Sequence, residues 1–262
     1  MENTLKKKIK RGERLIGSYL QLADVSIARI MGLVGFDFIW IDCEHSHMSY
    51  ETLLSHILAL RSTGTSVIVR APQHDLTATK KIVEMGVDGI IFPMIHTKEE
   101  ADEVIGNTLY PPYGTRGFGP MGAIDYGLKS VPDYIAGTRD ELCRFVQIEH
   151  KAAIENLDAI MENPYIDGYI FGPNDLSGSY DRLGDVFCDE LTAVIADAVK
   201  RLHAHGKYVG IASGGIADEV LTHWSSFGVE MLCAGADFDY LREGARKNRE
   251  KLSRIHKKSL DA

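Results

Sequence analysis

The stretch CRFVQIEHKAAIENLDAIMENPYIDGYIFGPNDLS, residues 143–177, decides how the rest of the chain is interpreted. It holds two short apolar runs, at residues 145–148 and 168–171, and apolar residues recur at helical spacing between them. The dipeptide Asn163-Pro164 ends that helical pattern. A strand, a helix and a second strand in this order predict two parallel strands that lie side by side.

Each of these two strands leads to a carboxylate. Glu149 comes directly after the first strand, and Asp175 follows the second by a few residues. Because neighbouring parallel strands end at the same edge of a sheet, the two carboxylates can converge there. Mg²⁺ and Mn²⁺ prefer oxygen ligands and keep several waters, so this pair could hold such an ion. The structural alternative is that Glu149 caps the helix that follows it and Asp175 forms a local turn.

Composition limits the class of protein. The chain has 262 residues, of which 45% are hydrophobic, so it can bury a large core. Its net charge of −8 argues against nucleic acid and against anionic membranes as partners. The four cysteines are scattered and form no CxxC, which indicates neither a zinc site nor a disulfide framework. The basic first fifteen residues contain no apolar segment, and no run approaches a membrane span, so we expect a cytoplasmic protein.

Strands and helices alternate along the whole chain. The run FDFIWIDC, residues 36–43, is typical of a strand that is buried on both faces. Asp24, Ser49 and Asp75 are suitable N-cap residues for the helices that follow them. The expected strands are 15–21, 36–43, 66–70, 89–93, 145–148, 168–171, 208–213 and 231–236. Besides the helix after Glu149, the expected helices are 25–34, 50–61, 76–85, 97–106, 189–205 and 238–258, and residues 108–127 form a long irregular connection.

Eight strand and helix pairs in a chain of this length predict a (β/α)₈ TIM barrel, which typically takes about 250 residues. The competing doubly wound sheet usually has fewer strands and a glycine fingerprint after the first strand. The sequence Gly17-Ser18-Tyr19 carries no such fingerprint. Neither a linker nor a shift in composition divides the chain, so we expect a single domain over residues 1–262.

The active site of such a barrel lies at the carboxyl ends of the strands, and polar residues gather there. Asp42, Glu44 and His45 follow the second strand, and Arg70 ends the third. Arg70 beside a cation on the two carboxylates would bind a 2-oxo acid and stabilise the oxyanion of a pyruvate enolate. His45 titrates near neutral pH and could move a proton, and Asp42 could orient its ring.

The remaining candidates concern substrate binding. Backbone N–H groups in the turn Gly172-Pro173-Asn174 could hold the substrate carboxylate, although Pro173 has no N–H. Gln147, two residues before Glu149, is a further candidate. No lysine falls inside a predicted strand, which argues against an aldolase that works through a Schiff base.

The motifs of this rim are similar to those of a known family. IDCEHSHMSYETL, VRAPQHD, GIIFPMIHTKEEA, YPPYGTRGFGP, QIEHKAAIENLDAI and GPNDLSGS resemble, in this order, the motifs of the HpcH/HpaI family of metal-dependent class II pyruvate aldolases. That family includes 2,4-dihydroxyhept-2-ene-1,7-dioate aldolase and the 2-keto-3-deoxy sugar acid aldolases. The similarity runs over about residues 17–237. It implies a class II aldehyde-lyase that reversibly cleaves a 4-hydroxy-2-oxo acid to pyruvate and an aldehyde through a metal-bound enolate. The implied cofactor is a divalent ion, Mg²⁺, Mn²⁺ or Co²⁺.

The resemblance also assigns roles to individual residues. Its metal ligands match Glu149 and Asp175, its oxyanion-stabilising arginine matches Arg70, and its proton-relay pair matches Asp42 and His45. Near the aldehyde, relatives carry Trp where this chain has Tyr19 and Leu where it has Ala212. These departures leave the identity of the aldehyde open.

The resemblance implies a homo-oligomer. The helix 76–85 resembles one at a subunit interface, where an acidic residue matching Glu84 reaches toward the neighbouring active site. The final helix, 238–258, resembles a segment that partners exchange to form dimers, which build hexamers. The residue-level alternative is that Glu84 is a solvated residue at the end of its helix, where its charge opposes the macrodipole.

Three other functions remain open at this point. The run GIASGGI, residues 210–216, resembles the phosphate loop that barrels place after strand seven, and would suit an isomerase or aldolase of a phosphorylated substrate. The superfamily also contains lyases that act on acyl-CoA thioesters. A barrel that binds without catalysing would be expected to have lost the carboxylates or Arg70, and none is missing.

Overall fold

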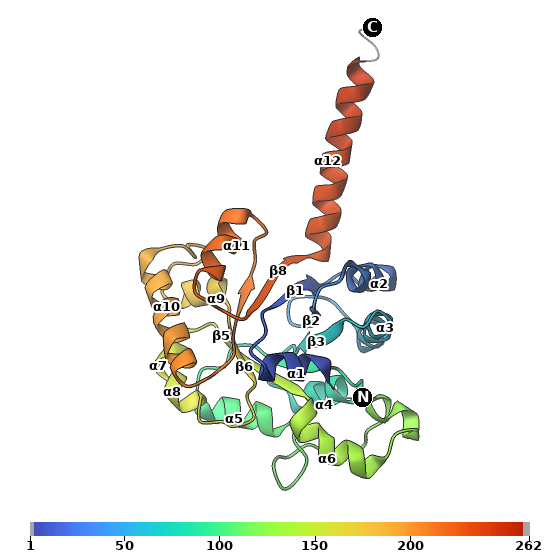
Figure 1. The fold of residues 1–262 in the computed structure, drawn as a ribbon, viewed down its shortest axis with the longest axis vertical. Helices are drawn as coiled ribbons and strands as arrows, with labels where there is room; N and C mark the ends of the chain where they lie inside the picture. The colour runs from blue at the N-terminus through green and yellow to red at the C-terminus, as the bar shows by residue number, and fades with distance from the viewer. Residues whose placement is uncertain (1–2, 259–262) are drawn as a thin grey trace.

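The structure, a computed structural model, describes residues 3–258. Eight parallel strands form a closed barrel in chain order, with helices around it, and β1 pairs with β8 to close the ring (Figure 1). The predicted (β/α)₈ barrel is therefore confirmed. The strands are β1 (Leu15–Leu20), β2 (Phe38–Asp42), β3 (Ser66–Arg70), β4 (Gly89–Phe92), β5 (Cys143–Ile148), β6 (Gly168–Phe171), β7 (Val209–Ser213) and β8 (Met231–Ala236).

Helices follow the strands and begin at the predicted caps. Asp24, Ser49 and Asp75 each accept a hydrogen bond from a backbone N–H in the first turn of the helix that follows. The helices are α1 (Thr4–Lys10), α2 (Val25–Val34), α3 (Tyr50–Arg61), α4 (Leu76–Glu84), α5 (Lys98–Gly106), α6 (Val131–Glu141), α7 (Lys151–Glu155), α8 (Leu157–Ile160), α9 (Pro173–Ser179), α10 (Asp189–Ala204), α11 (Asp218–Ser225) and α12 (Asp237–Lys258), with a 3₁₀ helix η1 (Gly122–Gly127).

The connection between β5 and β6 differs from the prediction. The single expected helix is two short ones, α7 and α8, which meet at Asn156. The side-chain amide of Asn156 donates to the carbonyls of Ala152 and His96, which holds the chain at this break. His150, not Glu149, caps α7, because its Nδ1 accepts the N–H of Ala152 at 3.1 Å. The helix-cap explanation of Glu149 is therefore wrong.

Alternate strand positions fill the inside of the barrel. Phe38 and Trp40 of β2 belong to one buried cluster, whereas Ile39 and Ile41, between and after them, pack in the cluster beneath the helices. The first cluster also contains Leu5 and Ile9 of α1, a helix that the sequence analysis did not predict. The barrel is thus a packed core, and α1 belongs to it.

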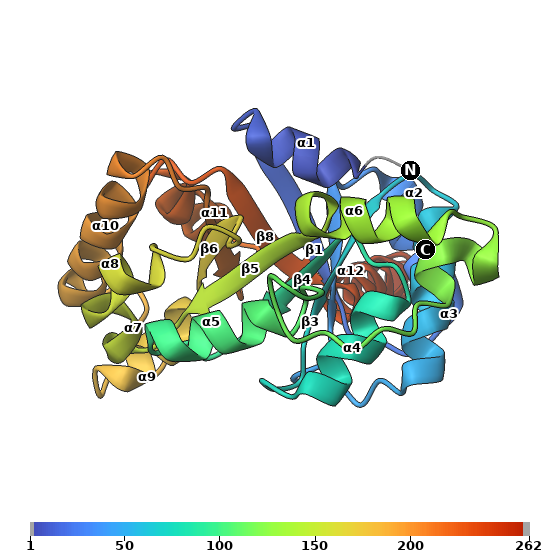
Figure 2. The same cartoon turned by 90° about the horizontal axis from the view of Figure 1, so that it is seen from below.

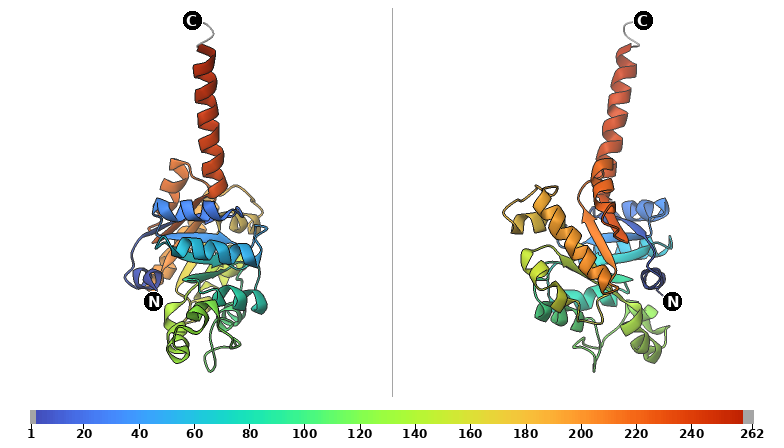
Figure 3. Two further views of the ribbon diagram at one scale, coloured as in Figure 1. Left: turned by 90° about the vertical axis from the view of Figure 1, so that its right-hand side faces the viewer. Right: turned by 60° about the vertical axis from the view of Figure 1, so that its left-hand side comes forward.

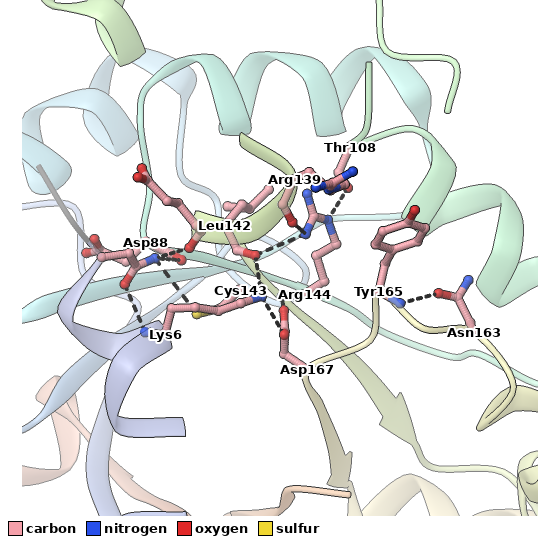
Figure 4. A network of polar contacts seen from close by, with 12 residues as sticks. Lys6, Asp88, Thr108, Arg139, Leu142, Cys143, Arg144, Asn163, Tyr165 and Asp167 are labelled. Atoms are coloured by element: carbon pink, nitrogen blue, oxygen red, sulfur yellow. Dashed lines mark hydrogen bonds and ion pairs between the residues drawn. The ribbon is translucent and has the colours of Figure 1, made fainter. Parts of the chain in front are cut away.

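Helix α1 lies at the end of the barrel where the strands begin (Figure 2), and polar contacts hold it there (Figure 4). The side chain of Asn3 donates to the carbonyl of Glu141 at 2.6 Å. Lys6 donates to the carbonyl of Leu142 at 3.1 Å and forms an ion pair with Asp167. These contacts join α1 to the end of α6 and to the loop before β6, so this end of the barrel is closed.

The last helix, α12, leaves the barrel after β8 and projects away from it (Figures 1 and 3). Leu241, Leu252 and Ile255 on this helix are exposed. The exchange of this helix with a partner involves a second chain and stays a prediction. Within residues 3–258, we find no helix with the length and apolar character needed to cross a lipid bilayer.

Candidate active site

A cavity of about 290 Å³ opens at the end of the barrel where the strands finish. Enzymes with this fold carry their active sites at that end. Every site residue predicted from the sequence lines the cavity except Pro173, which is buried as the first residue of α9, and Glu84. The predicted residues in its walls are Tyr19, Asp42, His45, Arg70, Gln147, Glu149, Gly172, Asn174, Asp175 and Ala212.

Arg70 and Asp42 form a buried, two-pronged ion pair at the cavity floor. The register of β2 and β3 places the two residues side by side. Arg70 Nε donates to Asp42 Oδ1 at 2.9 Å, and Nη2 donates to Oδ2 at 2.6 Å. Burial alone would raise the pKa of Asp42, but the hydrogen bonds and charge of Arg70 outweigh it and lower that pKa. Gln21 donates a further hydrogen bond to Asp42 at 2.7 Å, so the carboxylate and the guanidinium are fixed together.

The predicted contact between Asp42 and the ring of His45 is wrong in this structure. Asp42 Oδ1 accepts the backbone N–H of His45 at 3.3 Å and that of Glu44 at 3.0 Å. The carboxylate nearest the imidazole is Glu44, whose Oε2 lies 3.6 Å from His45 Nε2 and 3.0 Å from Arg70 Nη1. Asp42 therefore orients Arg70 and the backbone of the loop, and Glu44 links Arg70 to His45.

Glu149 is nearly as buried as Asp42, and both carboxylates line the cavity. Only 2% of the surface of Glu149 is exposed. Its Oε1 accepts the backbone N–H of Met94 at 2.7 Å, and its Oε2 accepts the amide N–H of Gln147 at 2.8 Å. Burial raises the pKa of Glu149 to about 7, and the neighbouring Glu44 and Asp175 add to the rise. The site thus keeps a carboxylate whose negative charge is only partly offset.

Two features of the backbone shape the surroundings of Glu149. A side chain at Gly172 would collide with the Glu149 carboxylate, which explains glycine at this position. Met94 has a φ of 52°, the left-handed region that residues other than glycine rarely adopt, while its N–H donates to Glu149. The missing side chain at Gly172 and the backbone N–H of Met94 thus both accommodate this carboxylate.

The residues fit a divalent cation that takes few protein ligands. Glu149 and Asp175 both line the cavity. Within residues 3–258, no three side chains of the His, Cys, Asp and Glu types come together as a metal cluster. Mg²⁺ and Mn²⁺ are commonly held by one or two carboxylates, with water and substrate oxygens in the remaining positions. A cation at Glu149 and Asp175 would also offset the excess negative charge beside Arg70. Metal binding itself stays a prediction.

The loop after β7 suits a phosphate poorly. Gly214 lines the cavity, as a phosphate loop would. However, the helix that follows, α11, carries Asp218 and Glu219 in its first turn. Two carboxylates at a helix N-terminus compete with a bound anion for the same backbone N–H groups and repel it.

Glu84 lies away from the cavity, at the end of α4. Its side chain is only 19% exposed, so the prediction of a solvated helix end is wrong. Its Oε1 lies 3.9 Å from Arg116 Nη2, and burial raises the pKa of its carboxyl. Within this one chain, Glu84 does not reach the candidate site.

Several residues at the site were missed or given no role by the sequence analysis. Glu44 and Gln21 contact the Asp42–Arg70 pair, and Met94 contributes only its backbone. Phe238 and Asp239, at the start of α12, complete the wall of the cavity. Gln21 and Glu44 could have been identified because each closely follows a strand end. The backbone N–H of Met94 could not, because it does not depend on the type of side chain.

Comparisons with known proteins point to one family. The family model described as HpcH/HpaI aldolase/citrate lyase matches residues 15–224. A hydroxypyruvate/pyruvate aldolase from Deinococcus radiodurans is 36% identical over 94% of this chain and 88% of its own length. A 4-hydroxy-2-oxo-heptane-1,7-dioate aldolase from Salmonella dublin is 33% identical over 94% of this chain and 92% of its own.

A solved structure gives the same result. The crystal structure of a HpcH/HpaI aldolase/citrate lyase family protein from Burkholderia cenocepacia has a TM-score of 0.89 and 25% sequence identity. The match covers 96% of this chain and 99% of that one. By its motifs, its barrel and the extent of these matches, the chain belongs to the HpcH/HpaI aldolase/citrate lyase family.

Proposed function

We propose that this chain is a class II aldolase that reversibly cleaves a 4-hydroxy-2-oxo acid into pyruvate and an aldehyde, with Mg²⁺ or Mn²⁺ as its cofactor. The observation that carries the proposal is the convergence of Glu149, Asp175 and Arg70 on one cavity at the strand ends. The relatives include a hydroxypyruvate/pyruvate aldolase and a 4-hydroxy-2-oxo-heptane-1,7-dioate aldolase, which favours this function over a thioester lyase or a phosphate-binding enzyme.

Cleavage places negative charge on the 2-oxo oxygen. A divalent cation held by Glu149 and Asp175 would polarise that oxygen as a Lewis acid. Arg70 would donate a hydrogen bond to the same oxygen as the carbon–carbon bond breaks. Asp42 and Trp40 hold the Arg70 guanidinium in place before substrate binds. Asp42 accepts two hydrogen bonds from it, and the centroid of the Trp40 ring lies 5.4 Å from Arg70 Cζ. A donor that is already in place stabilises the developing charge without reorganisation.

A base must also remove the proton of the 4-hydroxyl group, and an acid must later protonate the enolate carbon. We assign the proton transfer to His45, whose side chain is 60% exposed and lines the mouth of the cavity. Glu44 lies next to the ring, with its Oε2 3.6 Å from His45 Nε2. The first turn of α9, at Asn174 and Asp175, presents backbone N–H groups that can bind the substrate carboxylate.

The direct test of this function is the exchange of pyruvate methyl protons with solvent deuterium, because exchange requires the enolate but no aldehyde. We expect exchange by the Mg²⁺- or Mn²⁺-loaded protein, and loss of exchange to the solvent background after removal of metal with a chelator. Re-addition of the ion should restore it. Full exchange in the metal-free protein would contradict the role of the cation.

Replacing Arg70 by lysine tests the oxyanion donor. Lysine keeps the charge but lacks the planar set of donors, so it cannot keep the two-pronged contact to Asp42 and also donate to the substrate in the same geometry. Removal of one such donor costs on the order of 3 to 4 kcal/mol of transition-state stabilisation in other enzymes. We expect Arg70→Lys to fold, to bind Mn²⁺, and to lose most of its pyruvate exchange. Arg14→Lys, an exposed change before β1, is the matched control. Near wild-type exchange by Arg70→Lys would make Arg70 structural.

We further propose that the active protein is a homo-oligomer, in which dimers build a hexamer and Glu84 acts in a neighbouring site. Exposed apolar side chains support such interfaces. Ile30 and Leu33 of α2 and Leu252 of α12 are exposed. Phe118 and Met121 are exposed in the connection that leads into η1, and η1 packs against α4. Gly122, the first residue of η1, lies against the backbone of Glu84.

Mixing two inactive variants tests whether sites are shared. If Glu84 acts in trans, Glu84→Ala and Glu149→Ala should regain activity after subunit exchange, because some sites draw both residues from intact copies. Random dimers would recover up to about one quarter of wild-type activity. Mixing Glu149→Ala with Asp175→Ala is the control, because both changes damage the same site. Equal recovery in the control, no recovery despite shown exchange, or an active monomer would exclude sharing.

A further inference from the structure

The cavity has two chemically different sides. The side formed by β3, β5 and β6 carries Arg70, Glu149 and Asp175, to which the proposed function assigns the pyruvate half of the substrate. The other side is formed by β7, β8, β1 and the first turn of α12, and the aldehyde half must lie against it. Its side chains include Tyr19, Ala212, Phe238 and Asp239.

The aldehyde side offers no positive charge. Among the described residues that line the cavity, Arg70 is the only lysine or arginine. Its guanidinium is already bound by Asp42 at 2.6 Å and by Glu44 at 3.0 Å. The one imidazole in the lining, that of His45, lies next to Glu44. An anionic group on the aldehyde would therefore find no free cation in the protein wall.

Asp239 instead places a carboxylate on this side. Its side chain is 15% exposed, and its Oδ2 accepts the backbone N–H of Ala236 at 3.2 Å, which fixes its position. Arg242 pairs with Oδ1 at 2.8 Å from the exposed face of α12 and does not line the cavity. Of the two charged side chains in this ion pair, Asp239 is therefore the one that lines the cavity.

The size and apolar character of this side add a second limit. The cavity of about 290 Å³ must hold pyruvate as well as the aldehyde, which favours a short aldehyde. Phe238 and Ala212 present carbon atoms to it and can cover a short carbon chain. Among the described residues, this side has no positively charged side chain that could compensate the loss of water around an anionic group.

We propose that the electrophile is a short, uncharged aldehyde, and that Asp239 excludes aldehydes that carry a carboxylate. This inference rests on the proposed aldolase function. Two like charges brought together in a partly buried site are unfavourable, so specificity comes from repulsion of the wrong partner as well as from contact with the right one.

The first test compares two four-carbon aldehydes, butanal and succinic semialdehyde, as acceptors for pyruvate with the Mn²⁺-loaded wild-type protein. We expect kcat/KM for butanal to exceed that for succinic semialdehyde by about tenfold or more. Equal values, or a preference for succinic semialdehyde, would overturn the inference. Pyruvate proton exchange is measured in the same preparation. Absence of exchange would refute the proposed function itself, whereas exchange without the preference refutes only the inference.

The second test changes the charge of Asp239. In Asp239→Lys, the ratio of the two kcat/KM values should shift toward succinic semialdehyde by about tenfold, and in Asp239→Asn by less. Glu250→Lys makes the same change of charge farther along α12, outside the cavity, and should leave the ratio unchanged. An unchanged ratio in Asp239→Asn and Asp239→Lys, or an equal shift in Glu250→Lys, would overturn the role of Asp239. If Asp239→Lys does not fold, Asp239→Asn decides, because asparagine can still accept the N–H of Ala236.

Discussion

The structure of this site depends on the buried ion pair between Arg70 and Asp42. Two parallel strands in register place the residues together, and both prongs of the guanidinium meet the carboxylate. The charges of Arg70 and Asp42 cancel each other, so Arg70 does not fully compensate the negative charges of Glu149 and Asp175. Burial raises the pKa of Glu149 to about 7, and Glu44 and Asp175 contribute to that rise. A divalent cation held by Glu149 and Asp175, as the proposed function requires, would offset these charges.

The two ends of the barrel serve different purposes. At the end where the strands begin, α1 inserts Leu5 and Ile9 into the core. The side chains of Asn3 and of Lys6, the latter labelled in Figure 4, bind α1 to the end of α6. At the other end, the strands finish in polar residues that point into a cavity. Stability and chemistry are thus separated along the barrel axis, as is usual for this fold. The aldehyde side of the cavity is completed by α12, a helix that otherwise projects away from the barrel (Figure 3).

Sequence reasoning predicted the barrel and most of the cavity because both follow from local patterns. Apolar runs mark the strands, and a polar residue directly after a run, such as Arg70 or Glu149, must lie at the strand end. The partners of these residues could not be predicted in the same way. Asp42 was expected to orient His45, but it binds Arg70, because a buried guanidinium attracts the nearest buried carboxylate. Met94 acts through its backbone, which leaves no side-chain signal.

Direct binding of Mn²⁺ tests the central claim that Glu149 and Asp175 hold the cation beside Arg70. Electron paramagnetic resonance of free Mn²⁺ in titrations of the metal-free protein measures this without any substrate. We predict a single ion bound per wild-type chain and none at the same concentrations in Glu149→Ala or Asp175→Ala. Glu190→Ala, a change at the exposed start of α10, should bind as the wild type does. Unchanged Mn²⁺ binding by either cavity variant would contradict this account of the site.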